Sequence, residues 1–355
     1  MKDNFVTYVI KNRDNTFETM PFNDVDNLVL SEFVYYNLDD IVAEDGSEIS
    51  VREAFDKFKG ESRQRTIMGR FLVHPVKLFG YMAASKRFRN CKLSHYVSIS
   101  DGEHIQFAAL KIRLNDTMNY IAFRGTDGTM HGWKEDFSIA YRVTLSQRLA
   151  VKYLEKVIDR GKCNIIGGHS KGGLLAVYSS VMCHDELKQD ITAIYNNDGP
   201  GICENLLEES RYALIGNKTI KIVPKHTIIG LLFNNDTNIK VIKTSKRGFF
   251  QHYMDNWIIS EGTLVEEKMS YFSKWRQCII EAWLAEISLE ERKIIVDNMF
   301  DCFTAGGIKN WTQFANQNLL GYFRSFVLFF VFLLKSRQYV IRLLKIALCY
   351  FWRNL

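Results

Sequence analysis

Short apolar runs alternate with longer segments of helical periodicity through the middle of the chain. The apolar runs end at glycine, asparagine or proline turns, which is typical of buried strands. These predicted strands cover residues 105–112, 118–123, 162–167, 191–195, 219–223 and 239–242. Between them, residues 146–160 and 174–182 have the length and pattern of helices. Strands that alternate with helices predict a mostly parallel sheet with helices on both faces, which is an α/β fold.

The two ends of the chain have mainly helical patterns. Residues 1–22 lack a clear period and predict a loosely structured lead-in or a short extended element. Helices are expected over residues 22–38, 51–59, 75–88, 266–288 and 289–300. We therefore expect a helical N-terminal layer in residues 1–90, an α/β core in 91–265 and a helical C-terminal region in 266–355. The N-terminal layer is expected to pack over the sheet, with a substrate lid as the alternative.

The composition is that of a globular protein with a sizeable hydrophobic core. Of 355 residues, 47% are hydrophobic and 24% are charged, which excludes a disordered chain. The net charge is +6, but residues 302–355 contain seven Lys or Arg and no Asp or Glu, so the rest of the chain has a net charge of −1. The basic charge therefore belongs to the tail, which argues against a nucleic-acid-binding body.

Cysteine usage and the first residues bear on the cellular compartment. The seven cysteines are scattered and form no Cys-x-x-Cys pair. This pattern predicts reduced thiols, with neither a disulfide framework nor a zinc site. Residues 1–5 are not followed by a long apolar region, so a secretory signal peptide is not expected. We expect a cytoplasmic protein.

One pentapeptide carries the strongest chemical signal in the chain. Residues 168–172 are Gly-His-Ser-Lys-Gly, which matches the Gly-x-Ser-x-Gly nucleophile elbow. A predicted strand precedes it and a predicted helix follows it, as the elbow requires. The tight turn needs glycine on both sides and exposes the Ser170 oxygen above the sheet. A glycine-rich phosphate loop is the alternative, but Ser170 followed by Lys171 is not the Gly-Lys-Ser/Thr order of a P-loop.

A serine nucleophile needs a histidine base and an acid that orients this base. In a fold of this kind the acid and then the histidine follow the serine along the chain. Asp198 follows a predicted strand in a glycine-flanked turn, at the carboxyl edge of the sheet, and is the preferred acid. His252 is the favoured base because it comes after the last strand, and His226 is the alternative base. Asp236 is an alternative acid, again with His252 as base.

The negative oxygen of a tetrahedral intermediate needs hydrogen-bond donors. The backbone amide of Lys171, directly after the nucleophile, is one candidate. The other is Thr126, just beyond the strand at 118–123, which offers both an amide and a hydroxyl group. This chemistry needs no metal and no organic cofactor.

Three motifs of the chain together resemble the class 3 (fungal-type) lipases. These motifs are Ala-Phe-Arg-Gly-Thr at 122–126, Trp133 with Asp136, and Gly-His-Ser-Lys-Gly-Gly at 168–173. With Gly-Gly-His-Ser-Lys-Gly-Gly at 167–173 and Tyr-Asn-Asn-Asp-Gly-Pro-Gly at 195–201, the pattern over residues 20–265 is similar to an uncharacterised bacterial branch of that fold. The resemblance implies an α/β-hydrolase-like fold, a nucleophilic Ser170 and an oxyanion donor at Thr126.

The chain departs from the lipase pattern in two places. Lys171 replaces the usual apolar residue after the serine and brings a cation to the start of a helix. The acid of these lipases lies in an Asp-x-Val-Pro turn, whereas residues 221–224 are Lys-Ile-Val-Pro. The choice of Asp198 as the acid therefore depends on chain order alone.

The C-terminal tail combines apolar and basic residues. Residues 326–334 form a wholly apolar run of nine, which is shorter than the roughly 20 residues of a bilayer span. Further on, Arg342 and Lys345 interrupt apolar and aromatic residues. A basic amphipathic end suits contact with an anionic membrane surface through residues 322–355. The alternatives are packing on the domain or on a second subunit, and a tilted span interrupted by charges.

The sequence thus predicts a serine hydrolase that cleaves carboxylic esters, of a lipid-like kind, through an acyl-enzyme. Thioesters and amides are not distinguished from esters. The expected partners are an ester or lipid substrate and a membrane surface at the inner face, without nucleic acid. The rival from another class is a non-catalytic, membrane-associated binding or interaction protein on a hydrolase scaffold.

Overall fold

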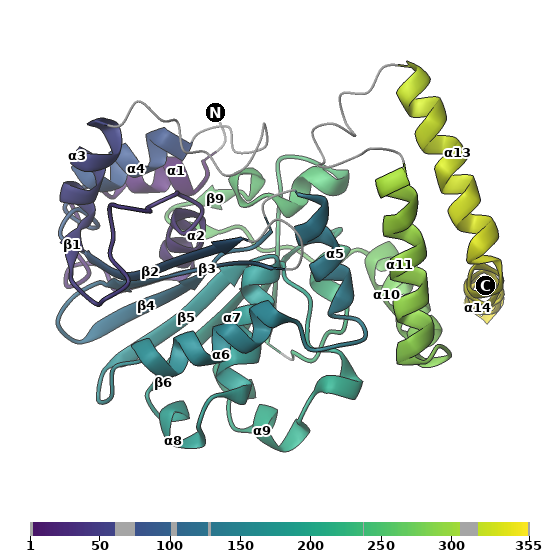
Figure 1. Cartoon of the computed structure of the whole chain (residues 1–355). Coiled ribbons are helices and arrows are strands. Elements are labelled where there is room, and N and C mark those ends of the chain that lie inside the picture. The colour runs from purple at the N-terminus through teal and green to yellow at the C-terminus, as the bar shows by residue number, and fades with distance from the viewer. Residues whose placement is uncertain are drawn as a thin grey trace.

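An eight-stranded sheet forms the centre of the molecule (Figure 1). The computed structural model describes residues 3–60, 75–100, 105–126, 129–236, 238–305 and 319–353. The strands lie in sequence order: β1 (Ile49–Ser50), β2 (Lys92–Ser100), β3 (Gln106–Arg113), β4 (Met118–Phe123), β5 (Cys163–His169), β6 (Ile191–Asn197), β7 (Thr219–Pro224) and β8 (Ile239–Ile242). β1 to β4 pair antiparallel, and β4 to β8 pair parallel. The predicted mostly parallel sheet is confirmed.

Helices cover both faces of this sheet. α6 (Leu145–Val157) and α7 (Lys171–Met182) lie on one face. The other face is covered by α1 (Phe5–Lys11) and α2 (Asp24–Phe33), with α3 (Val51–Gly60) and α4 (Pro75–Ala84) beside them. The α/β-hydrolase-like fold predicted from the sequence is therefore present.

Neighbouring residues of one strand face two separate hydrophobic clusters. Tyr120 packs with the N-terminal helices, whereas Ile121 packs with α6 and α7. On β5, Ile165 likewise packs in the cluster of the N-terminal helices, and Ile166 packs in the cluster of α6 and α7. Because successive side chains of a strand point to opposite faces, a strand buried on both sides is apolar throughout. This arrangement explains the uninterrupted apolar runs of the sequence.

The first residues correct one prediction. The sequence predicts a loosely structured lead-in or a short extended element over residues 1–22, but this segment contains the helix α1. Asn4 caps this helix: its side chain accepts from the amides of Val6 and Thr7. Phe5 and Tyr8 are buried in the core. The helix is too short to show a clear period, and tertiary packing stabilises it.

A buried ion pair joins the N-terminal helices. Arg87, just after α4, donates to both carboxylate oxygens of Asp26 on α2, over 2.7 and 2.5 Å. Both side chains are almost fully buried. The N-terminal layer thus shares one core with the sheet, and the domain boundaries at 90 and 265 remain a prediction.

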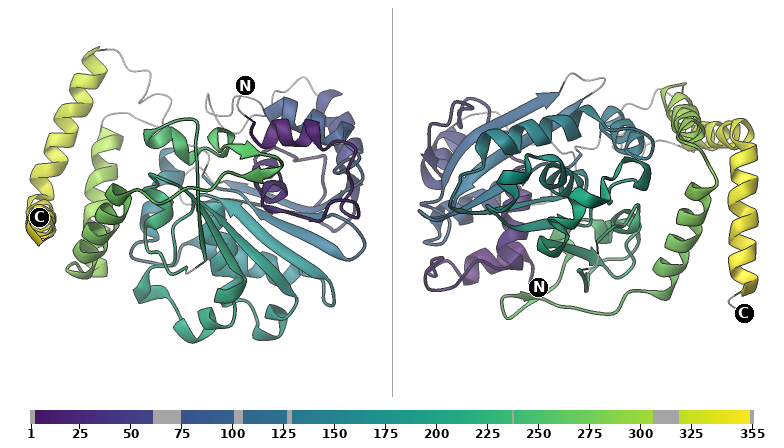
Figure 2. Two further views of the ribbon diagram at one scale, coloured as in Figure 1. Left: turned by 180° about the vertical axis from the view of Figure 1, so that it is seen from behind. Right: turned by 90° about the horizontal axis from the view of Figure 1, so that it is seen from below.

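A helical C-terminal unit packs beside the sheet (Figure 2). It contains α10 (Tyr271–Ala285), α11 (Leu289–Ala305), α13 (Leu319–Lys335) and α14 (Arg337–Arg353). α13 packs on α11, and α14 packs on α10. None of the helices in the described ranges has both the length and the apolar character needed to cross a bilayer.

Candidate active site

Ser170 occupies a strained turn between β5 and α7. Its backbone angles are φ 57° and ψ −127°, a conformation that L-residues rarely adopt and that costs on the order of 1–3 kcal/mol. A Cβ at Gly168 would lie 2.4 Å from the Phe123 carbonyl oxygen, and one at Gly172 would lie 2.2 Å from it. The turn therefore requires glycine at both positions, which is the geometry of a nucleophile elbow.

The structure brings Asp198 and His252 together. Asp198 follows β6, and His252 ends the short 3-10 helix η4 (Gly248–His252). The Nδ1 atom of His252 lies 2.7 Å from Oδ2 of Asp198. The other carboxylate oxygen, Oδ1, accepts the hydroxyl of Thr227 over 2.5 Å. With Nδ1 bonded to the carboxylate, Nε2 is the ring atom of His252 that would exchange a proton with a serine nucleophile.

The loop that carries His252 is fixed by its neighbours. The side-chain amide of Gln251 donates to the carbonyls of His226 and Gly248, and its oxygen accepts from the His226 amide. The indole of Trp257, which is fully buried, donates to the Gln251 carbonyl over 2.9 Å. These contacts hold the His252 backbone in place without help from the catalytic groups.

His169 links the nucleophile turn to the His252 loop. Its Nε2 atom lies 2.8 Å from the backbone carbonyl of His252, which can only accept. Nε2 therefore carries the proton, and Nδ1 accepts from the Tyr35 hydroxyl at 3.3 Å. Burial, with His252 nearby, holds the pKa of His169 well below its ordinary value, so its ring stays neutral. The rings of His169 and His252 lie 4.5 Å apart, which puts the base beside the turn of Ser170.

The loop after β4 lies directly against the elbow. A Cβ at Gly125 would be 3.3 Å from that of Ser170, and the Gly125 amide donates to the Tyr35 hydroxyl over 3.1 Å. The next residue, Thr126, is buried and donates its hydroxyl to Oδ2 of Asp136 over 2.5 Å. The hydroxyl proton is thus engaged, so the oxyanion role predicted for Thr126 would fall to its backbone amide.

The alternative base and acid lie in other surroundings. His226 is half-buried, and within the described residues no carboxylate forms an ion pair with its ring. Burial and then Lys225 lower its pKa. Asp236 accepts the hydroxyl of Tyr212 over 2.5 Å and lies 3.3 Å from Nζ of Lys221. The structure therefore does not bring Asp236 to His252.

Residues 82–301 match a family model described as Mbeg1-like, which is more than half of the chain. The chain belongs to the Mbeg1-like family. Among solved structures, the chain is similar to a crystal structure of M37 lipase. The identity is 13%, with 60% of this chain and 70% of that chain covered, at a TM-score of 0.33. None of the curated proteins matches.

The residues that match the Mbeg1-like family model include the elbow, Asp198 and His252. The narrower resemblance to class 3 lipases stays a prediction. Sequence reasoning missed three further residues of this site: Tyr35, Thr227 and Glu135, whose Oε2 atom lies 3.0 Å from Nζ of Lys171. No sequence signal points to Tyr35, which lies two residues after the end of α2, far from the elbow along the chain. Thr227 lies three residues after the Val-Pro turn at 223–224, where the resemblance placed the missing acid. Its hydroxyl donates to Asp198, the candidate acid that follows β6.

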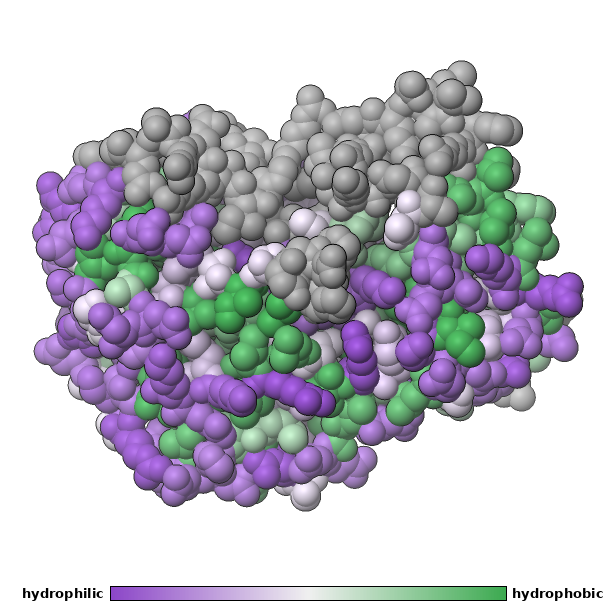
Figure 3. Space-filling model, in the orientation of Figure 1, coloured by the Kyte–Doolittle hydropathy of each residue, from purple (hydrophilic) through white to green (hydrophobic). Residues whose placement is uncertain are grey.

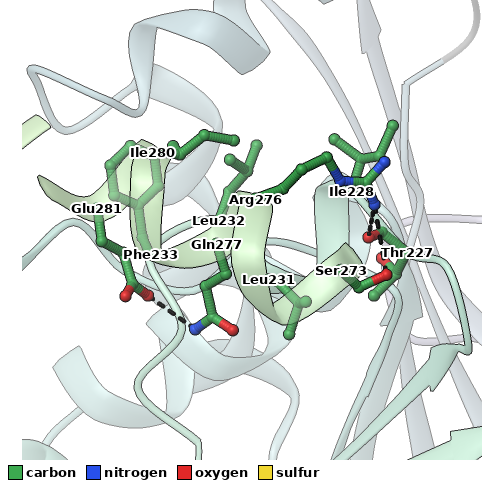
Figure 4. Close-up of a pocket in the computed structure, with 10 residues that line it drawn as sticks. All are labelled: Thr227, Ile228, Leu231, Leu232, Phe233, Ser273, Arg276, Gln277, Ile280 and Glu281. Atoms are coloured by element: carbon green, nitrogen blue, oxygen red, sulfur yellow. Dashed lines mark hydrogen bonds between the residues drawn. The ribbon is translucent and has the colours of Figure 1, made fainter. Parts of the chain in front are cut away.

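A small, mostly apolar pocket is lined in part by Thr227, the residue that bonds Asp198 (Figure 4). Its wall includes the turn at 227–233 and one side of α10. Arg276 of α10 donates to the carbonyls of His226 and Thr227 over 3.1 and 2.8 Å. Because Ser170 and His252 do not line this pocket, it is separate from the proposed reaction centre. Its contacts help to hold the turn that carries Thr227.

Proposed function

We propose that the chain is a serine hydrolase that cleaves carboxylic esters through an acyl-enzyme. The observation that carries the proposal is the 2.7 Å contact between His252 and Asp198, beside a serine in a strained elbow. Base and acid come from turns 54 residues apart in sequence. A packing histidine on the surface would not need a buried carboxylate partner.

The reaction follows from these positions. Oγ of Ser170 attacks the ester carbonyl carbon, and its proton passes to Nε2 of His252. The carbonyl oxygen becomes negative and accepts from the amides of Thr126 and Lys171, the latter at the positive end of α7. The intermediate collapses: the C–O bond to the alcohol breaks, and His252 returns the proton to the leaving oxygen. Water then repeats the cycle on the acyl-serine, which releases the acid.

Asp198 keeps this cycle oriented. Its carboxylate accepts from Nδ1 of His252 and stabilises the imidazolium that forms. The hydroxyl of Thr227 occupies its second oxygen. Asp198 has φ 50°, and its amide donates to the Ile222 carbonyl over 2.8 Å. This strained but anchored backbone supports its assignment as the acid in place of the missing Asp-x-Val-Pro aspartate.

The purified protein is expected to react with a fluorophosphonate probe, which labels activated serines. We expect His226→Ala to keep the labelling rate within about threefold, because within the described residues no carboxylate forms an ion pair with His226, whereas loss of a true base costs on the order of 10⁴-fold or more. In-gel fluorescence over a time course measures the labelling rates of the wild-type protein and of His226→Ala. Loss of labelling in His226→Ala would move the base to that residue. Folded wild-type protein that stays unlabelled, with and without lipid vesicles, would favour the non-catalytic binding scaffold.

We also propose that the C-terminal helices contact an anionic membrane surface. Seven large apolar side chains on α13 and α14 are exposed: Val327, Phe329, Phe330, Leu334, Ile341, Leu344 and Leu348. Figure 3 displays hydrophobic side chains gathered at the edge where α13 lies in Figure 1. Lys335, Arg337 and Lys345 are exposed beside them. Exposed apolar side chains flanked by cations fit the boundary between headgroups and acyl chains.

Removing these charges is expected to weaken vesicle binding. Each Lys or Arg near an anionic surface contributes about 1 kcal/mol, so Lys335→Ala, Arg337→Ala and Lys345→Ala together predict a loss of about 10²-fold. Co-sedimentation with phosphatidylglycerol vesicles measures it. The matched control removes three exposed cations remote from the tail, Lys152, Lys156 and Arg160. Equal binding to neutral vesicles would contradict the proposal, and a dimer lost with Leu344→Glu would favour packing on a second subunit.

A further inference from the structure

Lys171 is buried at a position where a cation is unfavourable. It is the first residue of α7, and its side chain is only 2% exposed. The amino end of a helix carries partial positive charge, so a cation there is destabilising unless it is paired. Nζ donates to the Gln106 carbonyl over 2.8 Å and to Oε2 of Glu135 over 3.0 Å. This side chain is therefore held in a fixed place beneath the nucleophile turn.

Glu135 is the partner that fixes it. Glu135 lies on α5 (Met130–Ser138), a helix that the sequence analysis did not predict. Its side chain is 4% exposed. Oε1 accepts the Ser146 amide at the start of α6 over 3.1 Å, and Oε2 also accepts the Gln106 amide at the start of β3 over 3.4 Å. The pair thus joins α5, α6 and β3 to the first residue of α7.

A second carboxylate lies within reach of the same cation. Oδ1 of Asp136 is 3.7 Å from Nζ of Lys171, and its Oδ2 accepts the Thr126 hydroxyl. Two carboxylates therefore stand near the two proposed oxyanion donors, Thr126 and Lys171. Unpaired negative charge there would oppose the negative oxygen of the intermediate, since charges interact strongly in a dry interior.

We infer that Lys171 and Glu135 are a positioning pair for the oxyanion site. Glu135 holds the Lys171 side chain, and the ammonium group offsets the negative charge that Asp136 places beside Thr126. Lys171, the cation that departs from the lipase pattern, is thus paired with Glu135, the residue before Asp136. This inference rests on the proposed hydrolase function.

The experiment compares Lys171→Met with the double variant Lys171→Met, Glu135→Gln. Both variants are made in the full chain, and hydrolysis of p-nitrophenyl butyrate is measured for each. Titration with the fluorophosphonate gives the concentration of active serines, so that kcat excludes misfolded molecules. Lys171→Met is expected to lower kcat per titrated serine about 10- to 100-fold with KM within about threefold, a smaller effect than losing an oxyanion donor itself. The double variant is expected to recover at least about half of that loss on a logarithmic scale, because it removes the unpaired buried charge.

Controls separate positioning from stability. Arg87→Met breaks the equally buried pair with Asp26, remote from the site, and should lower the Tm but leave kcat per titrated serine unchanged. If Lys171→Met does not fold, Glu135→Asp keeps the charge but shortens its reach, and should still lower kcat. Unchanged kcat in these variants, or no recovery in the double variant, overturns the inference. Absence of any labelling in the wild type would instead remove the hydrolase function, and this inference with it.

Discussion

Ser170→Ala is expected to abolish fluorophosphonate labelling and to reduce ester hydrolysis by about 10⁴- to 10⁶-fold. Removing the nucleophile of a serine hydrolase leaves only the rate contributed by binding and the oxyanion donors. The substitution deletes one oxygen that no packing contact requires, so the fold should persist. Labelling, hydrolysis of p-nitrophenyl butyrate and thermal unfolding measure these three outcomes.

Ser180→Ala is the matched control for this variant. Ser180 lies on the same helix, α7, is buried, and donates its hydroxyl to the Ala176 carbonyl over 2.8 Å. It should lower stability by about 1 kcal/mol, the usual contribution of one hydrogen bond, and leave labelling intact. Hydrolysis that survives in Ser170→Ala at the wild-type rate would mean that the activity comes from another site or a contaminant.

Asp198→Asn is expected to lower kcat by about 10⁴-fold, with a small change in KM. The amide would donate to Nδ1 of His252 and so stabilise the wrong tautomer, with the proton on Nε2, where the ring must accept from Ser170. Asparagine has the same shape as aspartate, so the loss of kcat should occur without a matching loss of stability. Steady-state kinetics together with the labelling rate test this expectation.

Asp236→Asn is expected to lower stability and keep activity, the reverse of Asp198→Asn. Asp236 is the buried partner of Lys221. Burial lowers the pKa of Lys221, and the negative charge of Asp236 opposes this effect. Removing that carboxylate leaves a buried cation without its partner and should cost about 3–5 kcal/mol of unfolding free energy. Activity per titrated serine should remain near the wild-type value. Loss of labelling in Asp236→Asn, with Asp198→Asn active, would exchange the acid assignment.

Chain order and local motifs predicted much of the candidate site. The elbow at 168–172 could be recognised from adjacent residues, because its two glycines and the following helix lie next to the serine, whereas the Phe123 carbonyl that excludes a Cβ at both glycines comes from another strand. Asp198 and His252 could be ranked because their places after successive strands put them at one edge of a parallel sheet. Thr126 was found from its position beyond β4, but its hydroxyl is engaged with Asp136, which chain order cannot show.

The sequence by itself determined the central strands with their two-sided burial and most of the helices, α1 and α5 excepted, since strand and helix periods depend on neighbouring residues. It also determined the basic tail, which is a matter of composition. Only the tertiary structure decided which groups meet. Tyr35 reaches His169, Thr227 supports Asp198, and Glu135 neutralises Lys171. These contacts join residues far apart in the chain, so the free energy of each depends on burial and distance that no local pattern encodes.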